Sequence, residues 1–74
     1  MRVKVANRMY NMSRKEFLGL LQVARENVPF GIYAIEKNGY AELMNVHVMS
    51  RTKLKEHVRA YRSQGYKVYT NDKG

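Results

Sequence analysis

The segment from Phe30 to Val48 limits the fold of this chain more than any other part of its sequence. Phe30–Lys37 is almost uninterrupted apolar sequence rich in strand formers, which is typical of a strand covered on much of both faces. Asn38-Gly39 then gives the strongest short-range hairpin signal, because both residues tolerate the positive φ of a type I′ turn. The sequence therefore predicts a central hairpin whose second strand covers Tyr40–Val48.

A shorter hairpin is predicted near the N-terminus. Apolar and polar residues alternate on both sides of Ala6-Asn7, and Asn7 tolerates positive φ better than most residues. A two-residue turn there places four apolar side chains on one face, and they are Val3, Val5, Tyr10 and Met12. The competing interpretation is one continuous strand that runs into a loop.

The first predicted helix begins at a capping box. The Ser13 hydroxyl can accept from the Glu16 amide while the Glu16 carboxylate accepts from the Ser13 amide. The helix ends near Asn27, because the residue before Pro29 is forced out of the α region. One apolar stripe lies between these ends, and its members are Phe17, Leu20, Leu21 and Ala24.

The second predicted helix covers Arg51–Gln64, with Ser50 as its cap and Gly65 at the left-handed stop position. Its apolar stripe consists of Leu54, Val58 and Tyr61. A closing strand over Tyr66–Thr70 precedes a polar tail, 71–74, that we expect to be frayed. The element order is ββαββαβ, with no linker or repeat. We therefore expect residues 1–74 to form one small α+β domain, a two-layer sandwich in which both helices cover one face of a mostly antiparallel sheet.

The composition excludes several classes of function. The 74 residues contain no cysteine, which rules out thiolate zinc sites and thiol nucleophiles. His47 and His57 lack the partners that a metal site or a catalytic triad needs. We expect no cofactor, no metal and no catalytic residue, and hence no enzyme. No apolar run approaches the roughly 18 residues that span a bilayer and no signal-peptide core is present, so we expect a cytoplasmic, intracellular protein without membrane contact.

The tripeptide Gly31-Ile32-Tyr33 is the one that opens the GIY-YIG nucleases, which makes a small nuclease one hypothesis. That family follows it with Tyr-Ile-Gly, a helical arginine and a metal-binding glutamate. The stretch Asn38–Leu43 lacks the second tripeptide, and no downstream constellation replaces it. Gly31 and Ile32 are therefore expected to serve sheet packing.

The second predicted helix carries the strongest functional signal. The chain has 14 Lys or Arg against 6 Asp or Glu, a formal charge of +8. At about 100° per residue, four cations fall within an arc of about 80° around the axis of this helix, beside its apolar stripe. We call these four residues the basic ridge: Arg51, Lys55, Arg59 and Arg62. Such a face could track nucleic-acid phosphates. The alternative is an ordinary solvated helix face.

Six tyrosines without a tryptophan supply a second signal. Four of them lie on predicted strands, where an exposed ring could stack on a base or anchor a protein partner: Tyr33, Tyr40, Tyr66 and Tyr69. We add Tyr40 and Lys67 to the basic ridge as candidate residues for nucleic-acid or partner binding. The alternative is that the rings pack over the edge of the core and leave only the hydroxyl in water.

Three segments resemble small orphan proteins of phages and mobile elements of Gram-positive bacteria, and they are Met9–Ser13, Val28–Glu36 and Gly65–Tyr69. Such proteins include anti-CRISPR inhibitors, small binders that block a Cas effector through protein contacts or by mimicking or masking nucleic acid. The resemblance implies an inhibitor of a nucleic-acid-handling complex in the host cell. A cationic chain cannot mimic DNA phosphate, so the expected partner is an acidic surface of the effector complex, or its DNA or RNA.

Direct DNA or RNA binding by the basic ridge is the second functional hypothesis. A helix, a hairpin and a basic helix over Ser13–Gln64 resemble, in order, a double-stranded-RNA-binding domain. The tight lysine cluster of that family, with its glycine and alanine pattern, is absent. An RNA-recognition motif and a helix-turn-helix are disfavoured by the missing aromatic motif and by the hairpin between the helices. Strands at Val3–Val5 or Tyr66–Thr70 are candidate edges for pairing between two copies in a homodimer.

Overall fold

The computed structural model of the chain describes residues 1–72, which form five strands and two helices in the expected order. The strands are β1 (Arg2–Val5), β2 (Arg8–Asn11), β3 (Phe30–Lys37), β4 (Tyr40–His47) and β5 (Lys67–Asp72). The helices are α1 (Arg14–Asn27) and α2 (Arg51–Ser63). The ββαββαβ order and the α+β class are confirmed.

One sheet contains all five strands, in the order β2-β1-β4-β3-β5. Neighbouring strands are antiparallel except β1 and β4, which are parallel, with Val3 beside Ala41. The expectation that Val3–Val5 forms an edge is wrong, because the Arg2 amide donates to the Gly39 carbonyl at 2.9 Å and β1 continues alongside β4. The edges of the sheet are β2 and β5.

Both predicted two-residue turns are confirmed. Ala6 and Asn7 have φ of 50° and 66°, and Asn38 and Gly39 have φ of 50° and 79°. Positive φ at both central residues is the mark of a type I′ turn, whose twist matches that of the strands it joins. The N-terminal segment is therefore a hairpin and not one continuous strand.

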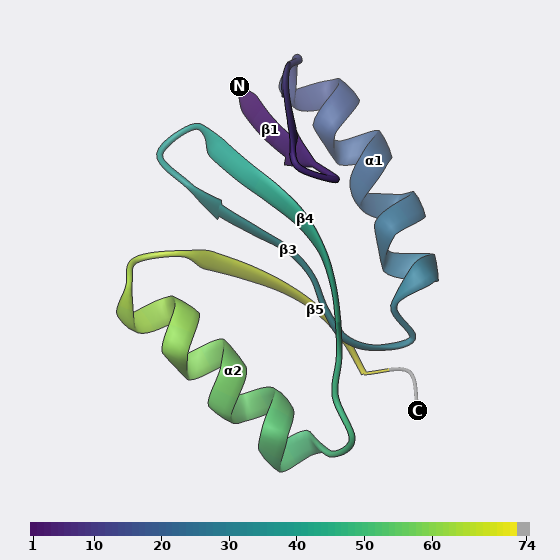
Figure 1. Cartoon of the computed structure of the whole chain (residues 1–74), viewed down its shortest axis with the longest axis vertical. Coiled ribbons are helices and arrows are strands. Elements are labelled where there is room, and N and C mark those ends of the chain that lie inside the picture. The colour runs from purple at the N-terminus through teal and green to yellow at the C-terminus, as the bar shows by residue number, and fades with distance from the viewer. Residues whose placement is uncertain (73–74) are drawn as a thin grey trace.

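The two helices lie on opposite faces of the sheet (Figure 1). Phe17 and Leu21 of α1 pack in one cluster, whereas Leu54 of α2 packs with Ile32 and Ile35 in another. The expectation of a two-layer sandwich with both helices on one face is wrong, and the observed arrangement has three layers. The apolar run of β3 is the physical reason, because successive strand residues point to opposite faces and both faces here need a cover.

A bulge in β3 changes which of its side chains point to each face of the sheet. The pairing of β3 with its neighbours shifts between Ile32 and Ala34. As a result Tyr33 and Ala34 both join the cluster under α1, while Ile32 and Ile35 belong to the cluster under α2. Among the described residues, Ile32 and Ala34 are fully buried and Tyr33 is 9% exposed.

The predicted caps fix the start of both helices. The Ser13 hydroxyl accepts from the Glu16 amide at 3.1 Å, and the Glu16 carboxylate accepts from the Ser13 amide at 3.3 Å. Ser50 accepts from the Lys53 amide at 3.2 Å. After α2 the chain turns at Gly65, whose φ of 88° is the left-handed conformation expected there.

The C-terminal strand is longer than predicted. Asn71 and Asp72 belong to β5, so the expectation of a frayed tail is wrong for these two residues; positions 73 and 74 lie outside the described residues. Asn71 is 6% exposed, and its side-chain amide donates to the Arg25 carbonyl at 3.2 Å. The same carbonyl accepts from the Val28 amide at 3.2 Å, where α1 ends. The second bond, from Asn71, ties β5 to that helix.

An ion pair joins α1 to the middle of the sheet. Arg14 donates to Glu36 at 2.8 Å, and the Tyr69 hydroxyl donates to the same carboxylate at 2.7 Å. The Glu36 side chain is only 15% exposed. The hydrogen bond from Arg14, with that from Tyr69, lowers the pKa of Glu36 below its ordinary value of 4.5 despite burial.

Glu36→Gln is expected to lower the free energy of unfolding by about 1 kcal/mol at neutral pH, because glutamine keeps a hydrogen-bond acceptor but loses the charge that pairs with an exposed arginine. A carboxylate with a lowered pKa stabilises the fold above its unfolded pKa, and this contribution disappears as pH falls through the folded pKa. Urea denaturation of wild type and variant at pH 7 and pH 3 measures this. A difference that does not shrink at pH 3 would contradict the assignment.

Candidate nucleic-acid interface

The basic ridge lies on the exposed flank of α2. Its four side chains are all exposed, and none of them forms an ion pair within residues 1–72. The cation of α2 that does have an acidic partner is Lys53, whose Nζ lies 3.5 Å from a Glu56 carboxylate oxygen. The positive charge of the basic ridge is therefore not neutralised by neighbouring carboxylates.

The apolar stripe of α2 explains why the basic ridge stays in water. Leu54 is 8% exposed, and Val58 and Tyr61 pack beside it against β3 and β5. Cations placed next to this stripe stand at the rim of the contact between helix and sheet, where long side chains keep their charged ends in solvent.

Three members of the basic ridge share one depression with β5. Lys55, Arg59 and Arg62 line a hollow of about 590 Å³, together with Leu54, Val58, Ser63 and Thr70. Arg51 lies outside this hollow, one helical turn before Lys55. Three of the four residues of the basic ridge thus lie close to β5 at Thr70.

The position of Arg51 is not explained by helix stability. The first turn of α2 contains no acidic residue, and its first residue is this arginine. The N-terminus of a helix carries partial positive charge, which disfavours cations and favours carboxylates. Arg62, in contrast, lies in the last turn, where a cation is stabilised.

Tyr40 and Lys67 do not join the basic ridge. Tyr40 starts β4, which β3 separates from β5, and its half-buried hydroxyl donates to Glu42 at 3.4 Å. Burial, and secondly the charge of Glu42, raise the pKa of Tyr40. Lys67 of β5 lies beside Glu36 of β3, on the face that α1 covers, and its Nζ lies 5.0 Å from the centre of the Tyr69 ring. The structure therefore keeps four of the six predicted residues together.

The other strand tyrosines take the packing role. Tyr33 and Tyr69 lie 6.1 Å apart between ring centres in the cluster beneath α1. Tyr66 makes an edge contact with Tyr61 of α2 at 6.2 Å. These rings support the sheet and are not free for stacking. Tyr10 of β2 is 45% exposed, but no feature of the sequence distinguished it.

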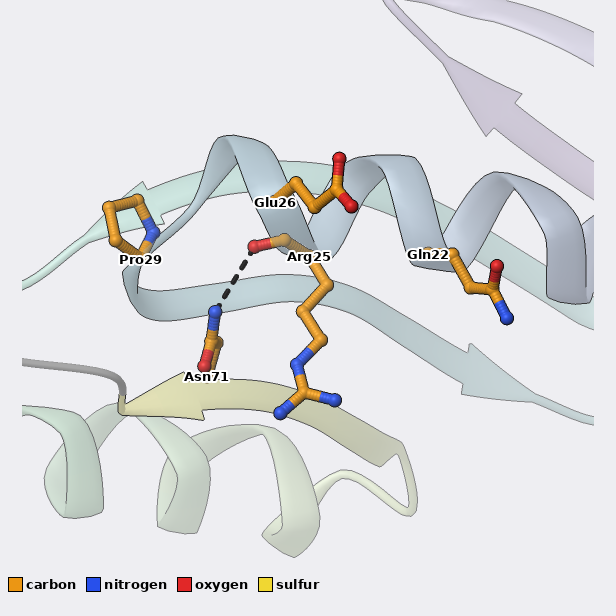
Figure 2. Close-up of a pocket in the computed structure, with 5 residues that line it drawn as sticks. All are labelled: Gln22, Arg25, Glu26, Pro29 and Asn71. Atoms are coloured by element: carbon orange, nitrogen blue, oxygen red, sulfur yellow. Dashed lines mark hydrogen bonds between the residues drawn. The ribbon is translucent and has the colours of Figure 1, made fainter.

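Arg25 is a cation near β5 that the sequence did not single out. It lies on α1, on the opposite face from the basic ridge, and its side chain extends toward β5 (Figure 2). It lines a polar depression of about 530 Å³ with Gln22, Glu26, Pro29 and Asn71. Arg25 approaches β5 from the other face because the two helices cover different faces of the sheet, whereas the sequence predicted both helices on one face.

The remaining candidate motifs are placed as follows. Gly31-Ile32-Tyr33 is buried inside β3. His47 and His57 are exposed, and within residues 1–72 no three His, Asp or Glu side chains gather as metal ligands would. In the same residues, neither helix has the length and apolar content that crossing a bilayer requires.

Comparisons with known proteins supply no relative whose role could be transferred to this chain. No family model, curated protein or solved structure matches it. The resemblance to phage and mobile-element proteins therefore stays a prediction, and the interface is assigned from its geometry and charge.

Proposed function

We propose that this protein is a non-enzymatic nucleic-acid-binding protein that contacts phosphates with the basic ridge of α2. The observation that carries the proposal is the row of four exposed cations without ion-pair partners in residues 1–72. Consecutive members are separated by about 4.5 to 6 Å along the helix axis. Cations at such intervals suit a row of phosphates, each of which releases counterions when it is neutralised.

The chemistry of the basic ridge favours backbone contacts over base reading. Lys and Arg side chains on a solvent-exposed flank of a helix bind phosphate oxygens, which position a protein but carry no sequence information. We therefore expect binding that tolerates many sequences. In keeping with the resemblance to phage and mobile-element proteins, we place this activity in the cytoplasm of a host cell, on a nucleic-acid-handling complex.

Fluorescence anisotropy with labelled DNA duplex, RNA duplex and single strands tests the proposal on the purified protein. In about 50 mM salt we expect binding at least as tight as the 10⁻⁴ to 10⁻⁶ M range that is common for sequence-independent contacts. No binding to any of the three probes at this salt concentration would refute nucleic-acid binding. The order of affinities identifies the preferred form of nucleic acid.

A second candidate function is an anti-CRISPR-like inhibitor that binds a protein effector directly. A specific observation favours it: Leu20 and Val23 of α1 are 36% and 58% exposed and line a depression of about 390 Å³ beside the turn after β1. Exposed apolar groups of this kind suit a protein contact. Capture of partners from host lysate with and without nuclease treatment separates the two functions, since only a directly bound protein is retained after nuclease.

A further inference from the structure

The β5 edge, by which we mean the outer side of Lys67–Asp72, is an open strand edge of the sheet. It is six residues long, whereas the opposite edge strand, β2, has four. Natural sheets usually protect such edges with proline, charged side chains, bulges or very short strands. β5 carries Lys67 and Asp72 but no proline, since the only proline of the chain is Pro29, in the connection between α1 and β3.

Inside β5, Val68 and Thr70 direct their backbone groups outward. The Val48 amide donates to the Phe30 carbonyl at 3.3 Å, so Phe30 faces β4 and the next residue, Gly31, faces β5. Gly31 pairs with Asn71, which therefore faces inward and leaves Thr70 facing outward. At the other end, Lys37 pairs with Tyr40 across the type I′ turn, so the same alternation turns Lys67 inward and Val68 outward.

Cations stand on both sides of the β5 edge. On the α2 side, Lys55, Arg59 and Arg62 share a hollow with Thr70. On the α1 side, Arg25 extends toward β5 (Figure 2), and Lys67 lies over the ring of Tyr69. Three acidic residues are close to this region: Glu26 lines the Arg25 depression, Glu36 of β3 lies beside Lys67, and Asp72 ends the strand.

We propose that the β5 edge binds an extended acidic segment of a protein partner, which adds to the sheet as a sixth strand. Its backbone would pair with the outward amides and carbonyls of Val68 and Thr70. Its alternate side chains would point to the two faces of the sheet, and each face offers cations to a carboxylate. The charge on both faces is what selects an acidic occupant.

Two other occupants of the β5 edge, a second copy of the chain and a nucleic acid, are disfavoured by their charge and chemistry. A second copy paired through β5 would bring the cations around both edges together, which opposes association. A nucleic acid has no peptide backbone to pair with Val68 and Thr70, and so would use the cations alone. This inference goes beyond the proposed function, but the two sites share Lys55, Arg59 and Arg62, so an acidic strand and a nucleic acid are expected to compete.

The probe is a synthetic eight-residue peptide in which Glu-Glu and Val-Val pairs alternate, so that carboxylates point to both faces of the sheet. Its control has lysine in place of glutamate. We expect the wild-type protein to bind the acidic peptide, not the lysine peptide, and to release labelled nucleic acid as acidic peptide is added. Equal binding of both peptides would overturn the proposal. So would a protein dimer, in sedimentation, that the acidic peptide dissociates, since the β5 edge would then belong to a second copy.

Thr70→Pro is the decisive variant, because it removes one outward amide without removing a hydrogen bond to β3. We expect at least about a tenfold loss of affinity for the acidic peptide, with nucleic-acid affinity unchanged. Met9→Pro is the matched control: Met1 and Met12 exchange hydrogen bonds at 2.7 and 3.0 Å, so alternation turns Met9 outward on β2. It should leave the affinity for the peptide unchanged. Equal effects of the two variants would refute docking at β5.

Circular dichroism establishes whether Thr70→Pro is folded. If it is not, Thr70→Glu replaces it, since a carboxylate at the hollow with Arg59 and Arg62 competes with those of the peptide. We expect this variant to lose affinity for the acidic peptide by about tenfold as well, and unchanged affinity would overturn the proposal. Peptide binding without nucleic-acid binding would refute only the proposed function, and the reverse would refute only this inference.

Discussion

Replacing all four residues of the basic ridge with glutamine is expected to lower nucleic-acid affinity at least about 100-fold in about 0.15 M salt. Four phosphate contacts release counterions, and the variant loses the binding free energy that this release contributes. Glutamine is a good helix former of similar length, so α2 should remain intact. The measurement is the dissociation constant of wild type and variant for one labelled duplex, with circular dichroism as the check on folding.

The control removes the same number of positive charges from elsewhere on the surface. It carries glutamine at four exposed positions outside the basic ridge, namely Arg2, Arg8, Lys15 and Lys53. We expect this variant to bind within a few-fold of wild type, because general attraction between unlike charges is weak once salt screens it. Equal losses in the two variants would show that net charge, and not the basic ridge, determines the affinity.

Gly31→Ala is expected to destabilise the fold by about 3 kcal/mol or more, a large part of the total for a chain of this size. Gly31 has a φ of 152°, which side chains rarely adopt, and it lies in β3 against β4. An added Cβ would run into the backbone carbonyl of Val46 and lie 3.1 Å from the Val28 side chain. Backbone atoms in a sheet cannot give way cheaply. Urea denaturation measures the loss.

Gly19→Ala is the matched control for this substitution. Gly19 lies on the exposed side of α1, and no atom stands within 4 Å of the position that its Cβ would take. Alanine is favoured over glycine inside a helix, so this variant should gain about 0.5 to 1 kcal/mol. Opposite signs for the two variants are the expected result; a neutral Gly31→Ala would contradict the close approach of β3 and β4.

The parts of the fold that could be predicted depend on neighbouring residues. Asn38-Gly39 forms its turn from its own backbone preferences, and Ser13 and Glu16 cap each other across one helical turn. The face that each helix covers is set by contacts between distant segments, and it was predicted wrongly. The apolar run of Phe30–Lys37 did contain the relevant information, since a strand that is apolar on both sides needs a layer on each.

Two long-range features had no marker in the sequence. β1 enters the sheet parallel to β4, a pairing that joins residues almost forty positions apart and that no turn specifies. Asn71 resembles a polar tail residue in the sequence, yet it is buried, and its side-chain amide donates to the Arg25 carbonyl in the last turn of α1. Side chains whose partners are distant in the chain are recognised only after the fold is known.

The same distinction applies to the candidate interface. Arg51, Lys55, Arg59 and Arg62 share one face because of helical periodicity alone, so their grouping follows from sequence. The approach of Arg25 to β5 depends on α1 and α2 lying on opposite faces. Tyr40 was predicted as a binding residue together with them. The order of the strands, which the sequence does not show, places it away from the basic ridge.

The salt dependence of binding tests phosphate contact by the basic ridge most directly. On one DNA duplex, the logarithm of the association constant is plotted against the logarithm of salt concentration for wild type and for the glutamine variant of the basic ridge. Four lost phosphate contacts predict that the wild-type slope is steeper by about 3 to 4. Parallel lines for the two proteins would contradict the assignment of α2 as the nucleic-acid interface.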